Sequence, residues 1–249
     1  MKKNIVLFLT FLLFVTIVNA ADKTVYLTTL EWAPYSSASL FDQGASIKVA
    51  TEAFNAMGYT LVVEFYPWER TLNLAEKSDK YAGYLPEYYS DSITDNFYFS
   101  DAIGEGPLGF VENKSNPIVW KTLNDLSSYT IGTVSGYVNT KDFDDLTAKG
   151  TIKVDSVVDD ITNIKKVKGG RIPLAIIDEN VFHYLIMINK TEDYGKHLQY
   201  NKKSLENKMI YVCFKKTPIG KEYLEIFNTG LKKINPEKIQ DDYFKKIFK

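Results

Sequence analysis

The stretch FYPWERTLNLAEKSDKYAGYLPEYYSDSITDNFYFSD, residues 65–101, carries the signals that decide the fold. Pro67 predicts a sharp turn after a strand, because its ring fixes φ and removes a backbone donor. Residues 69–77 place apolar side chains among polar ones in a way that is typical of a helix with one buried face. Residues 81–85 form a short apolar run of the kind found in buried parallel strands. The order strand, turn, helix, strand indicates an α/β sheet.

Polar and aromatic residues come directly after this second strand. Glu87 and Tyr88 follow its predicted end, and Asp91 and Asp95 lie a few residues further on. Open α/β sheets bind ligands beyond the carboxyl ends of their strands. Glu87 and Tyr88 are therefore candidate ligand-binding residues.

The first twenty residues have the pattern of a secretory signal peptide. Lys2 and Lys3 precede an apolar run at 5–18, and small residues at 18–20 predict cleavage after Ala20. The run is shorter than the roughly 20 residues of a membrane span, although an uncleaved anchor is the alternative. We expect an exported chain that is soluble in the periplasm.

Bulk composition excludes some classes of function. Without the signal peptide, 28 basic residues stand against the 31 acidic ones, since Lys2 and Lys3 are lost from 30. Such a balance gives no electrostatic footprint for nucleic acid. The single cysteine, Cys213, lies in an apolar run and is expected to be a buried strand residue. His183 and His197 have no ligand spacing, so neither a metal nor a cofactor is predicted.

Working back to the start of the mature chain, residues 24–30 read as the first strand, and Trp32 and Tyr35 lie in the loop that follows it. These two rings either belong to the core or form a stacking wall for a ligand. A helix at 44–57 and a strand at 61–65 complete a β-α-β unit, which implies a parallel sheet with right-handed crossovers.

Polar, turn-rich segments at 112–117 and 197–204 divide the rest of the chain. Strands and helices alternate afresh between them. We therefore predict an α/β fold with two lobes, each a mainly parallel sheet flanked by helices, joined by a two-strand hinge. The first lobe is discontinuous, at 21–112 and 204–249, and the second is inserted at 113–203.

The second lobe adds three candidate ligand-binding residues. Ser135 and Tyr137 follow the strand predicted at 130–134, and Asp178 follows the strand at 172–177. Asp178 is also placed to cap the next helix, and both roles are compatible. A ligand is expected in the cleft, at the strand ends of both lobes.

The element order and three local motifs resemble the family 3 solute-binding proteins of ABC importers, which bind polar amino acids on the type II periplasmic-binding fold. The motifs are Trp32-Ala33-Pro34-Tyr35-Ser36-Ser37, Tyr98-Phe99-Ser100-Asp101 and Gly170-Arg171-Ile172-Pro173-Leu174-Ala175-Ile176-Ile177-Asp178. The resemblance implies that Trp32 and Trp68 clamp a ligand side chain and that Asp178 binds a ligand ammonium. It also implies an ABC permease in the inner membrane as partner, and we expect a monomer.

The chain departs from this family where a ligand carboxylate is bound. The position of the family's arginine is Ile93 here, and Gly136 is followed by Tyr137 instead of a Ser or Thr. Arg70, close to Trp68, is a candidate replacement, or else it forms a surface salt bridge. Loss of a bidentate guanidinium removes a strong contact, so an ordinary α-amino acid is not the expected ligand.

The departures leave a predicted function with alternatives. We expect a non-enzymatic periplasmic protein that captures a small polar solute, amino-acid-like or modified. The carboxyl of Glu87 suggests a cationic or hydroxyl-rich part in that solute. The alternatives are a dehydratase-like enzyme with Glu87 or Glu179 as general acid, and a sensory or docking module without a transporter.

Overall fold

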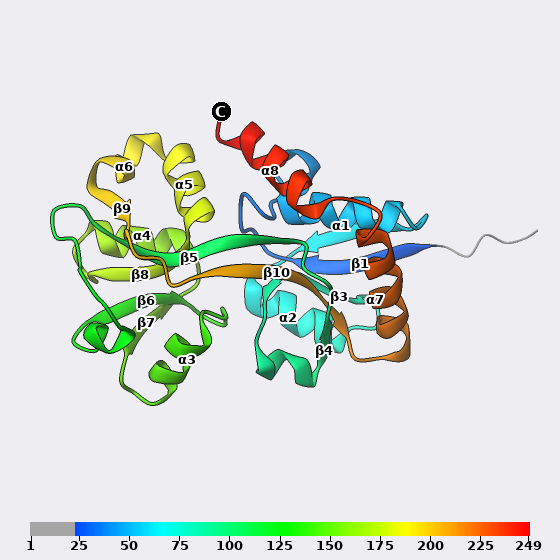
Figure 1. Ribbon diagram of the computed structural model, residues 1–249, viewed down its shortest axis with the longest axis horizontal. Coiled ribbons are helices and arrows are strands. Elements are labelled where there is room, and N and C mark those ends of the chain that lie inside the picture. The colour runs from blue at the N-terminus through cyan, green and yellow to red at the C-terminus, as the bar shows by residue number, and fades with distance from the viewer. Residues whose placement is uncertain (1–22) are drawn as a thin grey trace, which may run out of the picture.

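A computed structural model describes residues 23–249 (Figure 1). The predicted signal peptide at 1–20 lies outside the described residues. Within residues 23–249, no helix combines the length and the apolar character needed to cross a lipid bilayer. The strands are β1 (Thr24–Thr29), β2 (Thr60–Phe65), β3 (Gly83–Tyr88), β4 (Phe97–Phe99), β5 (Gly104–Asn113), β6 (Thr130–Val134), β7 (Lys153–Val157), β8 (Leu174–Asp178), β9 (Leu198–Tyr200) and β10 (Glu206–Lys215). The α-helices are α1 (Ala45–Asn55), α2 (Trp68–Lys77), α3 (Lys141–Ala148), α4 (Asp160–Lys168), α5 (Glu179–Ile188), α6 (Tyr194–His197), α7 (Pro218–Leu231) and α8 (Pro236–Ile247).

The strands are hydrogen-bonded in the order β2-β1-β3-β10-β5-β8-β6-β7, with β4 beside β10 and β9 beside β5. Strand β1 is parallel to β2 and β3, and β6 is parallel to β7 and β8. These two parallel groups lie on opposite sides of the molecule, and β5 and β10 run from one to the other (Figure 1). We call β1–β4 with α1, α2, α7 and α8 the first lobe, and β6–β9 with α3–α6 the second lobe.

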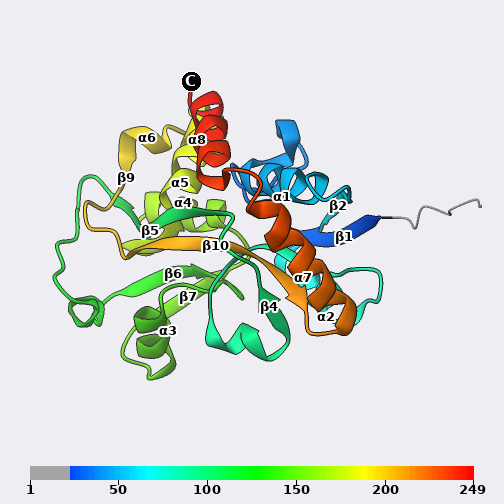
Figure 2. The ribbon, with the colours of Figure 1, turned by 45° about the vertical axis from the view of Figure 1, so that its right-hand side comes forward.

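The two crossing strands change partners halfway along their length. Residues 104–108 of β5 pair with residues 206–210 of β10 in antiparallel register. Beyond that point β5 pairs with β8, while β10 pairs with β3 and β4. The predicted two-lobe α/β fold is confirmed, and Figure 2 shows both crossing strands between the lobes. The turn-rich segments predicted as linkers, at 112–117 and 197–204, lie outside the stretch where β5 and β10 pair with each other.

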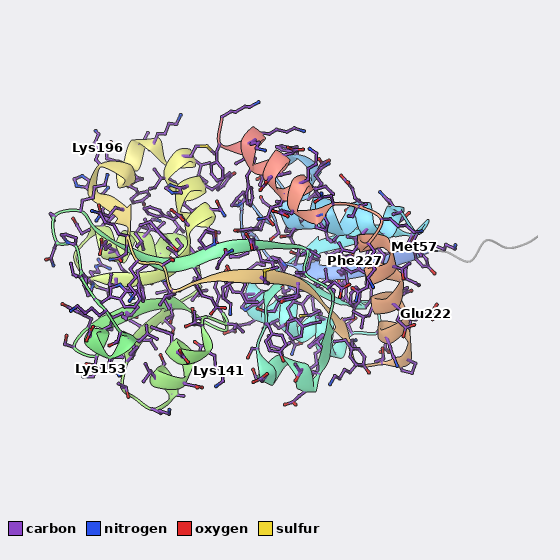
Figure 3. All side chains as sticks on the ribbon, viewed as in Figure 1. Met57, Lys141, Lys153, Lys196, Glu222 and Phe227 are labelled. Atoms are coloured by element: carbon purple, nitrogen blue, oxygen red, sulfur yellow. The ribbon has the colours of Figure 1, made fainter. Side chains whose placement is uncertain are left out.

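Helix packing on the first lobe follows the apolar stripe of α1. The ring centroid of Phe54 on α1 lies 5.1 Å from that of Phe227 on α7 and 6.3 Å from that of Phe214 on β10. Phe227 is labelled on α7 in Figure 3. All three rings are fully buried, and burial of such side chains is the main source of stability in a core.

A buried polar network ties the end of β5 to the segment that returns from the second lobe. The Glu112 carboxylate accepts hydrogen bonds from the Ile118 N–H (2.9 Å), Asn201 Nδ2 (2.7 Å) and Gln199 Nε2 (2.8 Å). Asn201 Nδ2 also donates to the Ile118 carbonyl at 2.9 Å. Since buried polar groups are costly when unpaired, these bonds fix how the two connecting segments lie side by side.

Candidate functional site

A small cavity of about 30 Å³ lies between the lobes, at the carboxyl ends of parallel strands from both. That volume holds about two water molecules. The first lobe supplies most of the lining and the second lobe supplies the loop after β6. The cavity is lined by Leu30, Trp32, Trp68, Pro86, Glu87, Tyr88, Tyr137, Val138 and Ile210.

A β-bulge in β3 directs Glu87 into this site. Tyr211 of β10 pairs with Glu87 and Cys213 pairs with Tyr84, so β3 carries one more residue than β10 between these points. Side chains alternate along a strand, and the extra residue therefore brings Tyr84 and Glu87 to the same side. Pro86 is tolerated there because a bulge leaves one residue outside the ladder.

The Glu87 carboxyl is buried and hydrogen-bonded by its own strand. Oε1 accepts from the Tyr88 N–H at 2.8 Å, and Oε2 accepts from the Tyr84 hydroxyl at 3.1 Å. Burial raises the pKa of Glu87 to about 8, while these hydrogen bonds and the charge of Lys208 act in the opposite direction. The group therefore exchanges a proton near neutral pH.

Four aromatic rings form the walls of the cavity. Trp32 and Tyr88 meet edge to face, with ring centroids 5.8 Å apart, and Trp68 and Tyr137 do the same at 5.8 Å. Trp68 Nε1 donates to the carbonyl of Gly136 at 2.9 Å, which joins the first lobe to the second. An aromatic lining of this kind favours planar or cationic guests, which stack on or lie over ring faces.

Asp178 lies behind these walls and receives hydrogen bonds from both lobes. Its Oδ1 accepts from the N–H groups of Asn180 (2.8 Å) and Val181 (3.1 Å), which confirms the predicted helix cap. Its Oδ2 accepts from the hydroxyls of Tyr35 (3.0 Å) and Tyr88 (3.2 Å), both on the first lobe. Burial raises the pKa of Asp178 to about 7 against the opposing effect of these donors.

Asp160, the first residue of α4, is a second buried acid at the lobe contact. Burial, together with the nearby charges of Asp178 and Asp159, raises the pKa of its carboxyl to about 7, and a hydrogen bond with the side chain of Trp32 opposes this rise. Sequence reasoning missed Asp160. The signal was the acidic pair at 159–160 opening a helix, which also fits an ordinary N-terminal cap.

The structure brings most of the predicted ligand-binding residues together. Trp32, Trp68, Glu87, Tyr88 and Tyr137 line the cavity, and Tyr35 and Asp178 lie behind it, with Tyr35 stacked on Trp32 at 4.5 Å. The lining residues that the sequence did not indicate are Leu30, Pro86, Val138 and Ile210.

Two predicted residues lie apart from the cavity lining. Arg70 is exposed on α2, and its guanidinium lies over the ring of Tyr66 at 4.8 Å. Ser135 is half-buried after β6, where its N–H donates to the Val157 carbonyl. A helix turns through 100° per residue, so closeness to Trp68 in sequence did not place Arg70 on the same face.

A wider groove adjoins the cavity and shares Val138 with it. Its volume is about 510 Å³, and both lobes and β10 contribute to it. Lys208 lies there, with Nζ 3.5 Å from Glu206 Oε1 and 5.5 Å from the ring centroid of Tyr88. We call this the outer groove; it is lined by Tyr89, Ser90, Asp91, Ser92, Val138, Lys141, Asp144, Asp145, Ala148, Glu206 and Lys208.

Compared by sequence, the chain matches no protein-family model and no curated protein. Its fold is similar to that of solved periplasmic-binding-protein-like domains. An amino acid ABC transporter substrate-binding protein, AbpA of Streptococcus pneumoniae, bound to L-arginine, aligns with a TM-score of 0.72 and 19% identity over 91% of this chain and 97% of that one.

Sensor domains align equally well. The VFT2 domain of BvgS from Bordetella pertussis aligns with a TM-score of 0.72 and 14% identity, over 90% of this chain and 93% of that one. A histidine kinase sensor domain aligns with a TM-score of 0.73 and 13% identity, over 91% and 94%. At these identities the likeness establishes the fold, which transporters and sensors share.

Proposed function

We propose that this protein is an exported, non-enzymatic solute-binding protein that holds a small polar solute between its two lobes. The observation that carries the proposal is the cavity itself, which both lobes line at the carboxyl ends of their strands with one carboxyl and four aromatic rings. Solved proteins of this fold with bound L-arginine support it.

In this proposal the lobes move as two bodies about β5 and β10. A solute that touches both lobes favours the closed arrangement, because only there does it gain all its contacts. The membrane partner that reads closure is either an ABC permease, as for the transporter proteins above, or a sensor kinase, as for the sensor domains. Permease and ATPase genes beside the coding sequence would favour import.

Intrinsic fluorescence offers a direct test, because two of the three tryptophans line the cavity. Trp120 is the other, hydrogen-bonded to Asn201 in the second lobe. In a Trp120→Phe variant, the tryptophan emission comes from Trp32 and Trp68 alone. We expect a panel of amino acids, amines and sugars to include solutes that shift this emission saturably, raise the melting temperature and are recovered unchanged. If no solute on the panel shifts the emission or the melting temperature, the proposal is wrong; if a solute is converted, the protein is an enzyme.

A further inference from the structure

Formal charge in the cavity is of one sign. Among the described residues that line it, Glu87 is the one that carries a formal charge. The sequence has two arginines, and both are exposed: Arg70 lies on Tyr66, and Arg171 lies in the turn before β8.

Two further acids lie close to the cavity. Asp160 and Asp178 are buried behind the aromatic walls, and neither is paired with a cation among the described residues. The cation whose charge acts on Glu87 is Lys208, which is itself buried, lines the outer groove, lies 3.5 Å from Glu206 and lies over the ring of Tyr88. A ligand carboxylate in the cavity would therefore meet buried acids and no guanidinium, and like charges at such a site repel strongly.

We propose that the cavity receives the ammonium head of an organic cation that carries no carboxylate, with Glu87 as its counter-ion; this inference rests on the solute-binding function proposed above. Four aromatic rings line the space around this head, and aromatic rings attract cations. They are those of Trp32, Trp68, Tyr88 and Tyr137. Each Glu87 oxygen accepts one hydrogen bond within the protein and keeps a second lone pair for the ligand.

Size determines how such a ligand lies. A cavity of about 30 Å³ takes a primary ammonium group with its first carbon and excludes a longer chain. The remainder of the ligand extends past Val138 into the outer groove, whose volume is about 510 Å³. The class is therefore an amine whose remaining part occupies the outer groove.

Proton release accompanies binding, because the cation needs Glu87 ionised. The titratable groups that face Glu87 are Tyr84 and Tyr88 from β3, Lys208 and Cys213 from β10, and Tyr137 from the loop after β6. Burial raises the pKa of these tyrosines and of the Cys213 thiol, so they stay neutral between pH 6 and pH 8. Amine affinity should therefore rise with pH over this range, by on the order of tenfold from about pH 6.5 to about pH 8.

Matched pairs of probes that differ by one carboxylate provide the test. Calorimetric titrations of the whole mature chain compare cadaverine with lysine, agmatine with arginine, and tyramine with tyrosine. We expect at least one amine to bind at least about tenfold more tightly than its carboxylated partner, since 1.4 kcal/mol corresponds to tenfold. Glu87→Gln should weaken binding of that amine by about tenfold and flatten its pH dependence, leaving only the smaller part that comes from Asp160 and Asp178. Glu69→Gln, which removes an exposed acid beside Trp68, should change neither.

The outcomes separate this inference from the proposed function. If the carboxylated member of a pair binds more tightly, the inference is wrong while solute binding stands. Loss of that preference in Lys208→Met would then show that Lys208 binds the carboxylate. If other solutes shift tryptophan emission but no amine binds, the inference is wrong in the same way. If nothing binds, both are wrong. The comparisons within wild-type pairs and the wild-type pH series need no variant, so misfolding of Glu87→Gln would not prevent a decision.

Discussion

Asp178 divides its two oxygens between two tasks. One oxygen caps α5 within the second lobe, and the other receives the hydroxyls of Tyr35 and Tyr88 from the first lobe. The cap is a local feature that any small polar residue can supply. The contact with two buried tyrosines needs a second acceptor at a fixed place.

Substitution of Asp178 by Ser separates these tasks. The serine hydroxyl can still cap α5, but the Tyr88 hydroxyl loses its acceptor and the Tyr35 hydroxyl keeps only the Glu105 carbonyl at 3.5 Å. At about 1–3 kcal/mol for each unpaired group, the free energy of unfolding should fall by roughly 2–4 kcal/mol. Urea denaturation measures this loss.

Asp159 provides the matched control, because it caps α4 through a 2.9 Å bond from the Thr162 N–H and is otherwise exposed. Asp159→Ser should cost less than about 0.5 kcal/mol, since Ser and Asp are similar caps. Equal losses in the two variants would show that the tyrosine contacts contribute nothing.

The positions of individual side chains were predicted least well from the sequence. It indicated Trp32, Trp68 and Asp178 through their motifs, and the structure places all three around the cavity. It could not establish that Glu87 faces the cavity, because that depends on an unpaired residue in β3 that leaves no periodic signal. Arg70 shows the converse error, in which nearness in sequence does not translate into a shared face.

Three glycines give β5 a surface without side chains at the lobe contact. A Cβ at Gly104 would lie 1.7 Å from Gln240 Oε1, and one at Gly109 would lie 2.3 Å from Tyr200 Oη. At Gly106 it would lie 2.1 Å from Asp178 Oδ2 and 2.2 Å from Tyr35 Oη. The crossing strand thus leaves space for side chains from other elements. Among them are Tyr35 and Asp178, whose hydrogen bond joins the two lobes.

Gly106→Ala should disrupt the hydrogen bond between Tyr35 and Asp178. The added methyl group must displace Tyr35 or Asp178, and overpacking of this kind costs about 1–3 kcal/mol in unfolding free energy. Gly169→Ala, at the end of α4 where the nearest atom is 3.2 Å away, should cost much less. Tyr35→Phe removes one of the two crowded oxygens, so Gly106→Ala should cost less unfolding free energy in the Tyr35→Phe background. If the double variant loses as much unfolding free energy as the two single variants together, this explanation is contradicted.

The network around Glu112 offers a second test on the connecting segments. Glu112→Ala removes the acceptor of two buried donors, the Ile118 N–H and one Asn201 amide hydrogen, and of the half-buried Gln199 amide, and should lower the unfolding free energy by about 2 kcal/mol or more. Glu112→Gln should recover most of this loss, because the Gln199 amide can turn to accept. Urea denaturation curves of both variants check the order, and equal destabilisation would argue against a role for these hydrogen bonds.

Elements were predicted better than residues. The strand at Thr130–Val134 has the predicted bounds, and most helices begin or end within a few residues of expectation. The short strands β4 and β9 were missed, since each has three residues and pairs only at the edge of a crossing strand. Such pairing depends on distant partners and not on local pattern.

Across the whole molecule, the lobe contact contains three buried carboxyls with raised pKa values. Those of Asp160 and Asp178 are about 7 and that of Glu87 is about 8. In an unfolded chain all three would lie near 4. Between these values the folded protein holds more protons than the unfolded one, so stability is greatest at the acid end and is lost as pH rises.

We therefore expect the melting temperature to fall from about pH 5 to about pH 8. Lys80 and two tyrosines lower the pKa of Glu64 to about 2. The contribution of Glu64 to folding stability is therefore lost only below this pH window. Scanning calorimetry of the wild type should show the fall. The double variant Glu87→Gln, Asp160→Asn should show a flatter profile, and a wild-type profile that rises instead would mean that these acids are ionised in the fold.

One extra residue in β3 sets the direction of the Glu87 carboxyl and not its face. If either Leu85 or Pro86 were deleted, Tyr84 and Glu87 would stand two positions apart, and regular alternation would still place both on one side. What the bulge adds is a local bend of the strand, which changes the direction of the carboxyl. Among chains of this fold, an acid aligned with Glu87 across a single-residue gap at this point should therefore face the same cavity from a different angle, a difference visible by superposition.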